Sequence, residues 1–224
     1  MKTSIRAAFP TLDSIRWGPR LSSLTYLRAV IDESMRLAPL APGPLQRKAL
    51  AGGVTIDVGA GNTHTFPAGT DLAVPALAIM RNPACYTDPL TFDPERWLSD
   101  EDKDEDDQID KHDHDDDEKT TRNDENKDDD MLDSRRSKKV ELKRAQTAFC
   151  PFSVGPRGCV GRALAYVEMT IAVARLLWAL DVRRAPGSCV GKDASGGTRG
   201  LYKLKDGFVV EKEGPVVQFR RRRV

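Results

Sequence analysis

A cysteine in the C-terminal half of the chain stands where a protein could hold a thiolate for metal binding. Cys159 follows a Gly-Pro turn and precedes a segment with apolar residues at three- and four-residue spacing, namely Leu164, Val167, Ile171, Ala174 and Trp178. This spacing predicts an amphipathic helix that begins near Gly161. Unpaired backbone N–H groups and the positive dipole end at a helix N-terminus favour a thiolate, which is the form that binds iron.

The neighbours of Cys159 suit a flat, negatively charged ligand. Gly155 and Gly161 let the backbone approach a planar macrocycle where a Cβ atom would collide. Arg157 stands where it could bind an anionic propionate. Phe152 would place an apolar ring beside the sulfur and keep water away, which tunes an iron–thiolate bond. These residue types predict a haem-thiolate loop.

The same ten residues resemble the cysteine-ligand loop of the cytochrome P450 family, the haem-thiolate monooxygenases, whose pattern is Phe-x-x-Gly-x-Arg-x-Cys-x-Gly. The five fixed positions are filled by Phe152, Gly155, Arg157, Cys159 and Gly161. A buried or disulfide-bonded cysteine beside a Gly-Pro turn is the alternative, and five matched positions argue against it. The resemblance implies that these residues bind haem b and that Cys159 is the axial ligand of its iron.

Two other segments resemble motifs of the family, in the family's order along the chain. An apolar stripe in residues 22–37 predicts a helix on which Glu33 and Arg36 share one face. Such a pair alone is usually a solvated ion pair. Residues 92–97, Phe-Asp-Pro-Glu-Arg-Trp, resemble the family's Pro-Glu-Arg segment. The resemblance therefore implies a buried structural triad of Glu33, Arg36 and Arg96, without a catalytic role.

The remaining ordered segments predict short strands and turns. Strands are expected at residues 53–58, 64–66 and 71–75, and a closing hairpin is expected from residues 201–210 and 215–220. Arg47 resembles the basic residue from which many family members reach a haem propionate, with an ordinary exposed arginine as the alternative. We expect a mainly helical α+β fold with a small antiparallel sheet, which corresponds to the C-terminal part of the cytochrome P450 fold.

An acidic tract separates the Pro-Glu-Arg segment from the cysteine loop. Residues 99–130 hold 18 Asp/Glu and five Lys/Arg, a net charge of −13, whereas the rest of the chain carries +14. High charge and low hydrophobicity predict disorder. We expect a single domain built from residues 1–98 and 140–224, with a disordered acidic insertion at 99–139.

The charge and the cysteine content of the chain limit which partners and metal or redox sites it can have. A basic body attracts acidic proteins, and the resemblance implies an NADPH-dependent flavoprotein reductase or a ferredoxin as electron donor, with a small organic substrate and no nucleic acid. The four cysteines form no Cys-x-x-Cys pair, so neither a zinc ribbon nor a redox dithiol is indicated. Family members are expected at the cytosolic face of the endoplasmic reticulum through an N-terminal anchor. This chain has no run of eighteen apolar residues, so we expect it to be cytoplasmic.

The function that the resemblance implies is NADPH-supported monooxygenation, in which one oxygen atom enters an organic substrate. No segment corresponds to the family helix whose acid–alcohol pair protonates bound dioxygen, so we expect this chain alone to be inactive. Whether it is itself an enzyme is left open. The alternative is a non-catalytic remnant, or an interaction module organised by the acidic tract, that never binds haem stably.

Overall fold

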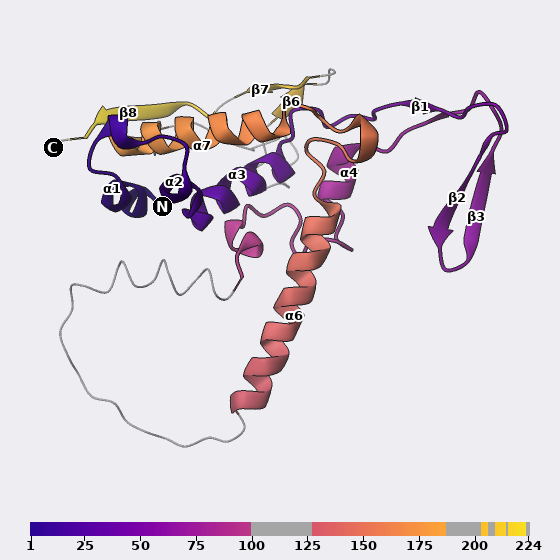
Figure 1. Cartoon of the computed structure of the whole chain (residues 1–224), viewed down its shortest axis with the longest axis horizontal. Helices are drawn as coiled ribbons and strands as arrows, with labels where there is room; N and C mark the ends of the chain where they lie inside the picture. Colours follow the sequence, from indigo (N-terminus) through magenta and orange to yellow (C-terminus); the bar gives the residue numbers. More distant parts are fainter. Residues whose placement is uncertain (100–126, 187–202, 206–208, 214, 223–224) are drawn as a thin grey trace.

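The computed structural model of the chain describes residues 1–99, 127–186, 203–205, 209–213 and 215–222 (Figure 1). The helices are α1 (Lys2–Ala8), α2 (Pro19–Ser22), α3 (Thr25–Leu37), α4 (Ala76–Met80), α6 (Lys127–Ala148) and α7 (Arg162–Ala179), with 3₁₀ turns η1 (Leu12–Ser14), η2 (Pro94–Trp97) and η3 (Gly155–Arg157). The strands are β1 (Arg47–Lys48), β2 (Val54–Gly59), β3 (Asn62–Phe66), β4 (Asp71–Leu72), β5 (Leu180–Arg184), β6 (Lys203–Lys205), β7 (Glu211–Glu213) and β8 (Val217–Arg221). The predicted combination of helices and small antiparallel sheets is confirmed.

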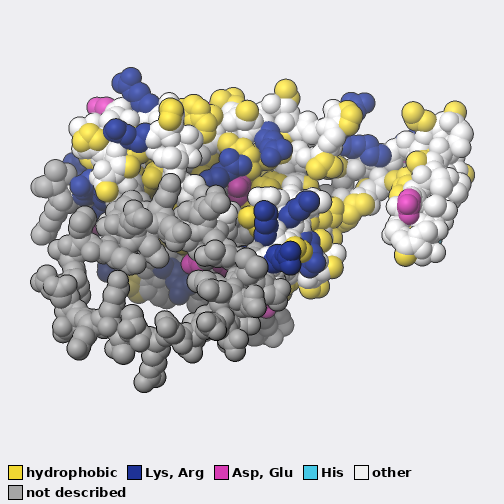
Figure 2. All heavy atoms as spheres, turned by 60° about the horizontal axis from the view of Figure 1, so that its bottom comes forward, with side chains coloured by type: hydrophobic (Ala, Val, Ile, Leu, Met, Phe, Trp, Pro, Cys, Tyr) yellow, Lys and Arg dark blue, Asp and Glu magenta, His cyan; other side chains and the backbone are white. Residues whose placement is uncertain are grey.

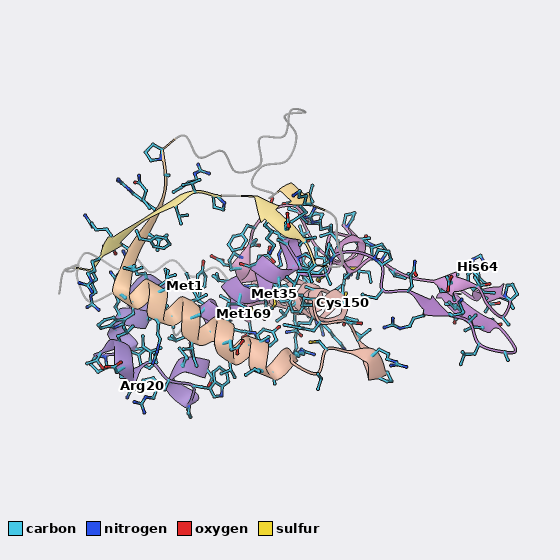
Figure 3. The ribbon with its side chains drawn as sticks, turned by 90° about the horizontal axis from the view of Figure 1, so that it is seen from above. Met1, Arg20, Met35, His64, Cys150 and Met169 are labelled. Carbon is cyan, nitrogen blue, oxygen red and sulfur yellow. The ribbon has the colours of Figure 1, made fainter. Side chains whose placement is uncertain are left out.

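The main core lies between α1, α3 and α7. Its buried members are Ile5, Phe9, Ile15, Leu21, Leu27, Ile31, Tyr166 and Ala174. Figure 3 shows Met35 of α3 close to Met169 of α7, and both side chains pack against this core. Of the predicted apolar stripe on α7, Ala174 is buried, and Ile171 and Trp178 pack against this core. The helix also buries Tyr166 and Thr170, whereas Leu164 of the stripe is exposed. Leu164 instead lines a cavity.

A buried polar contact links α3 to α7. The hydroxyl of Tyr166 donates to Oδ1 of Asp32 at 2.8 Å, and Nε of Arg28 donates to Oδ2 at 2.8 Å. The guanidinium of Arg28 also lies 3.6 Å from the centroid of the Tyr166 ring. Burial raises the pKa of Asp32, and burial together with Asp32 raises the pKa of Tyr166. The tyrosine hydroxyl therefore remains a donor that ties the two helices together.

Four two-stranded antiparallel sheets are formed by the described residues. The hairpin of β2 and β3 projects from the body, and its hydrophobic side chains are visible on the surface of the projecting lobe in Figure 2. Gly53 begins this hairpin with φ of +73°, and a Cβ atom there would lie 2.5 Å from the carbonyl oxygen of Phe66. Only glycine fits that position without a shift of the backbone. His64, on β3, lies far from Cys150 (Figure 3).

The strands at the C-terminus pair differently from the predicted closing hairpin. β6 pairs with β7, whereas β8 pairs with β5, the strand that directly follows α7. For the described residues, the expectation that residues 201–210 pair with 215–220 is therefore wrong. Periodicity identified these strands but could not identify their partners, and β5 was not recognised as a strand. Its pairing with β8 brings Arg220 opposite Asp181.

Helix α6 corrects the predicted extent of disorder. It begins at Lys127 and runs to Ala148, so residues 127–139 are helical rather than disordered. The sequence from 127 to 148 has no Gly or Pro, and 13 of its 22 residues are Lys, Arg, Leu, Ala, Met or Glu, which favour helix despite the high charge of the stretch. Its last turns are docked through buried Ala145 and Ala148. The expectation for residues 100–126 lies outside the described residues.

Asp181 connects the N-terminal helix to the last sheet. Its carboxylate accepts hydrogen bonds from Lys2, Arg6 and Arg220 at 2.9, 3.1 and 3.3 Å. These bonds hold the pKa of Asp181 well below its ordinary value of 3.8. The ionised carboxylate therefore stabilises the fold above about pH 4, and this contribution is lost as the pH falls through the lower folded pKa.

We accordingly predict a pH-dependent effect for Asp181→Asn. The difference in free energy of unfolding between the parent and the variant should have its full size at pH 7 and should shrink below pH 3.8. Urea unfolding followed by tryptophan fluorescence from pH 7 to about pH 3 measures it. A difference of constant size across that range would contradict the assignment of this ion cluster.

Among the helices that the structure describes, none combines the length and the apolar character that crossing a lipid bilayer requires.

Candidate functional site

The segment from Cys150 to Gly161 folds into a tight loop in front of α7. The N–H of Cys159 donates to the carbonyl of Phe152 at 2.9 Å, and the N–H of Gly158 donates to the carbonyl of Gly155 at 2.9 Å. Gly155 has φ of +73°, a backbone conformation that residues other than glycine rarely adopt. The role of this glycine is therefore conformational: it closes the loop and brings Cys159 back beside Phe152.

Cys159 lies directly before the first turn of α7. Gly161 is the N-cap residue, Arg162 begins the helix, and the N–H of Arg162 donates to the carbonyl of Cys159 at 3.3 Å. The thiol is exposed, and a Cβ atom at Gly161 would stand 3.8 Å from its sulfur. The structure thus places the cysteine at a helix N-terminus with its thiol accessible from one side.

A cavity of about 780 Å³ opens beside this thiol, between the cysteine loop, the first turns of α7 and the two segments at residues 40–47 and 74–79. Five predicted site residues line it, namely Arg47, Phe152, Arg157, Cys159 and Gly161. Its volume falls within the range of about 300–1,000 Å³ that is typical of ligand pockets. The structure therefore brings together residues that are more than one hundred positions apart in the sequence.

The rest of the cavity wall is largely apolar. Leu40, Val74 and Leu164 line it and are between 61% and 65% exposed, which is unusual for three aliphatic side chains around one cavity. Glu168 contributes the only acidic group among the lining residues. Sequence reasoning did not identify these four residues as part of the site. Leu164 was assigned to the core stripe, and no signal distinguished the other three.

Two arginines bring positive charge to this cavity. Arg157 lies in η3 of the cysteine loop, and Arg47 lies on β1, where it pairs with Leu72 of β4. Nη1 of Arg47 donates to the carbonyls of Gln46 and Leu45 at 2.8 and 3.5 Å, and the residue is exposed. Guanidinium groups bind carboxylates with bidentate geometry. The cavity can therefore hold a ligand with an apolar body and anionic groups.

The cysteine loop is also tied to the core. The rings of Phe152 and Tyr166 have centroids 5.4 Å apart and are tilted by 54°. Cys150, at the other end of the loop, is buried, and this burial raises the pKa of its thiol. Cys150 is therefore a packing residue, whereas Cys159 presents an exposed thiol.

The predicted structural triad forms a buried cluster around the Glu33 carboxylate. Nε and Nη2 of Arg36 donate to its two oxygens at 2.7 and 2.8 Å, and Nε of Arg96 donates at 3.2 Å. Glu33 and Arg36 are fully buried, and the side chain of Arg96 is 10% exposed. Although burial alone would raise it, these partners and the N–H of Asp93 hold the pKa of Glu33 below its ordinary value. The Glu33 carboxylate is therefore ionised, and its charge is balanced by the guanidinium groups of Arg36 and Arg96.

Arg36 uses all of its donors. Besides Glu33, it donates to the carbonyls of Met80, Pro89 and Thr91 at 2.9, 2.6 and 3.1 Å. These carbonyls belong to α4 and to the irregular segment that leads to η2. One guanidinium on α3 thus fixes the path of the chain between residues 80 and 91.

Trp97 is a partner of the cluster that sequence reasoning did not assign. Its Nε1 donates to Glu33 at 3.0 Å, and its ring lies 4.7 Å from the ring of Phe149, centroid to centroid. Phe149 directly precedes Cys150 and the cysteine loop. Trp97 therefore links the buried carboxylate to the start of the loop. Its place next to Arg96 in the recognised motif was the signal that could have identified it.

Tyr86 is a second unassigned partner. The guanidinium of Arg36 lies 4.9 Å from its ring centroid, and its hydroxyl donates to the carbonyl of Ala145 in α6 at 2.9 Å. Burial raises the pKa of Tyr86, so its hydroxyl stays protonated as a donor. The cluster thereby also anchors the end of α6 that leads into the cysteine loop.

Comparisons with known proteins point to one family. A family model described as Cytochrome P450 matches residues 13–208. The chain is 37% identical over 220 residues to the cytochrome P450 monooxygenase atnE of Emericella nidulans, covering 98% of this chain and 34% of that protein. It is 34% identical over 225 residues to a cytochrome P450 monooxygenase of Gibberella zeae, covering 97% of this chain and 42% of that protein. The chain therefore spans less than half the length of these curated relatives.

Proposed function

Because this chain belongs to the cytochrome P450 family, we propose that its cavity forms one side of a haem b site in which Cys159 supplies the iron ligand. The observation that carries this proposal is the meeting of an exposed thiol, two guanidinium groups and an apolar wall around one cavity of about 780 Å³. Haem b is the cofactor of the family, and it has the same combination of an iron, an apolar ring system and two carboxylates.

The residues present fit that group. Leu40, Val74 and Leu164 offer exposed aliphatic surface for a flat apolar ring system. Arg47 and Arg157 approach the same cavity from different elements, as two propionates require. The absence of a side chain at Gly161 leaves the space beside the sulfur of Cys159 open, since a Cβ atom there would stand 3.8 Å from it. Each chemical part of the cofactor therefore has a matching group in the cavity.

Each residue of the proposed site would have a different role. Cys159 would bind the iron as a thiolate, and Phe152 would shield the sulfur from water, which lowers the local dielectric constant. Arg47 and Arg157 would bind the propionates and set the orientation of the ring system. When bound, haem supplies the redox chemistry by which dioxygen is activated, and a thiolate ligand favours O–O cleavage.

The chain covers less than half of its relatives' length, so the activity is proposed for a protein of full length. We propose that such a protein inserts one oxygen atom into a small organic substrate, with electrons from NADPH delivered by a flavoprotein reductase or a ferredoxin. Support comes from the relatives, which are named cytochrome P450 monooxygenases. A location at the cytosolic face of the endoplasmic reticulum is part of the same proposal and rests on the family alone.

Haem titration of the purified chain tests the proposed site. We expect saturable binding of about one haem per chain, and a ferrous carbon monoxide adduct that absorbs far to the red of a histidine-ligated one. The exposed apolar wall of the cavity predicts that bound haem is lost readily to apomyoglobin in a transfer assay. Binding without saturation, or an adduct without thiolate character, would refute the proposal.

A further inference from the structure

Helix α6 carries basic side chains on the side that faces away from the body of the protein. Ala145 and Ala148 mark its buried face. The exposed residues Arg136, Lys139 and Lys143 follow one another at i, i+3 and i+7, which places them together on the opposite face. We call these three residues the basic stripe. In Figure 2, which brings the lower side of Figure 1 toward the viewer, Lys and Arg side chains gather near the centre of the face.

The basic stripe forms no ion pair with the acidic side chains that the structure describes. No carboxylate of residues 1–99, 136–186 or the described C-terminal strands forms an ion pair with Arg136, Lys139 or Lys143. Glu141, on the same helix, instead accepts a hydrogen bond from Thr87 at 3.2 Å. Between residues 135 and 144 the sequence has six Lys/Arg and a single Glu. Like charges at this spacing repel one another, so an acidic partner would stabilise the helix.

The chain's own connectivity brings an acidic segment to this helix. The chain leaves the described body at Ser99, just after Trp97, whose ring lies 4.7 Å from that of Phe149 at the C-terminal end of α6. It returns at Lys127, the first residue of α6. A helix of 22 residues is about 33 Å long. Residues 100–126 must therefore join one end of α6 to the other.

That connecting segment has the complementary charge. Residues 100–126 contain 15 Asp/Glu and four Lys/Arg. We propose that this acidic segment docks on the basic stripe of its own chain. Tethering at both ends of the helix raises the effective concentration of the segment at the stripe.

Cross-linking of the intact chain with a zero-length carbodiimide tests this contact. The reagent joins carboxylates to lysines that are in direct contact, and Lys139 and Lys143 should take most of the links from residues 100–126. Raising the salt from about 20 mM to about 0.5 M should reduce these links at least fivefold, because salt screens exposed charges within a Debye length. Links spread evenly over Lys48 and Lys205, which are 64% and 79% exposed, would overturn the proposal.

Two variants with the same loss of charge provide the matched comparison. Arg136→Gln, Lys139→Gln and Lys143→Gln together should make Glu-C cleavage within residues 100–126 about threefold faster at low salt, as expected for loss of several exposed ion pairs. Arg20→Gln, Arg184→Gln and Arg221→Gln together remove three exposed arginines elsewhere and should leave the rate unchanged. Equal rates in the two variants would refute docking on the stripe.

A mixture of isotope-labelled and unlabelled chains separates docking within one chain from docking between two copies. Our proposal expects cross-links within one isotopic species at all concentrations. Links that join the two species in proportion to their mixing would overturn it and would assign the stripe to a second copy of the chain.

Discussion

Replacing Cys159 by serine is expected to abolish haem binding by this chain. A serine hydroxyl remains protonated at neutral pH and is a poor iron ligand, so the cavity would keep its apolar wall and its arginines but lose the bond to the metal. The loop should still fold, because its closing hydrogen bonds use the backbone of Phe152, Gly155 and Gly158. Haem titration and the carbon monoxide difference spectrum measure the loss.

The other cysteines supply the controls for this experiment. Cys85→Ser and Cys189→Ser should keep the thiolate spectrum; Cys85 packs against a different cluster, and Cys189 lies outside the described residues. Cys150→Ser should also keep it, at some cost in stability, because this buried thiol is replaced by a hydroxyl. A Cys159→Ser chain that retains the same thiolate spectrum would refute the assignment of Cys159.

Replacing Glu33 by alanine is expected to lower the free energy of unfolding by about 3–5 kcal/mol, which is the usual cost of leaving a buried charge without its partner. Arg36 would lose two charge-assisted hydrogen bonds while remaining fully buried. Arg96 and Trp97 would lose their contacts with the same carboxylate. Urea unfolding measures the loss, and the yield of folded chain should fall with it.

A surface ion pair of similar length provides the matched control. Lys205 and Glu211 are 2.8 Å apart but are 79% and 77% exposed, so Glu211→Ala should cost less than about 1 kcal/mol. Arg96→Ala should fall between these two cases, because the buried Glu33 carboxylate would keep its hydrogen bonds from Arg36 and Trp97 and so would not be left without a partner. Equal losses for Glu33→Ala and Glu211→Ala would show that burial does not control the strength of this cluster.

The sequence alone was enough to predict the family, the helices that flank the site and the candidate site residues. These predictions needed only local patterns: the spacing of apolar residues predicted helices α3 and α7, and the five fixed positions of the motif predicted the cysteine loop. The family prediction is confirmed by the match of residues 13–208. The assignments of haem-binding residues stay predictions, although Arg47, Phe152, Arg157, Cys159 and Gly161 meet at one cavity.

Contacts between distant residues were decided only by the tertiary structure. Glu33 receives hydrogen bonds from Arg96 and Trp97, more than sixty positions away, and Tyr166 bonds to Asp32 across 134 positions. A periodic pattern shows that a residue lies on a face, but it does not show which residue the face meets. For the same reason the pattern predicted β8 but not its pairing with β5.

Helix α6 shows most clearly the difference between what the sequence predicts and what tertiary packing decides. Charge and hydrophobicity, averaged over a window, predicted disorder for residues 99–139, yet residues 127–139 are helical. Helix propensity within that stretch is favourable, but an isolated helix of such charge is marginal in water. Docking decides the outcome, because Tyr86 and the buried face at Ala145 and Ala148 fix one end of the helix. The sequence determined what these residues could form, and packing against the body determined that they form it.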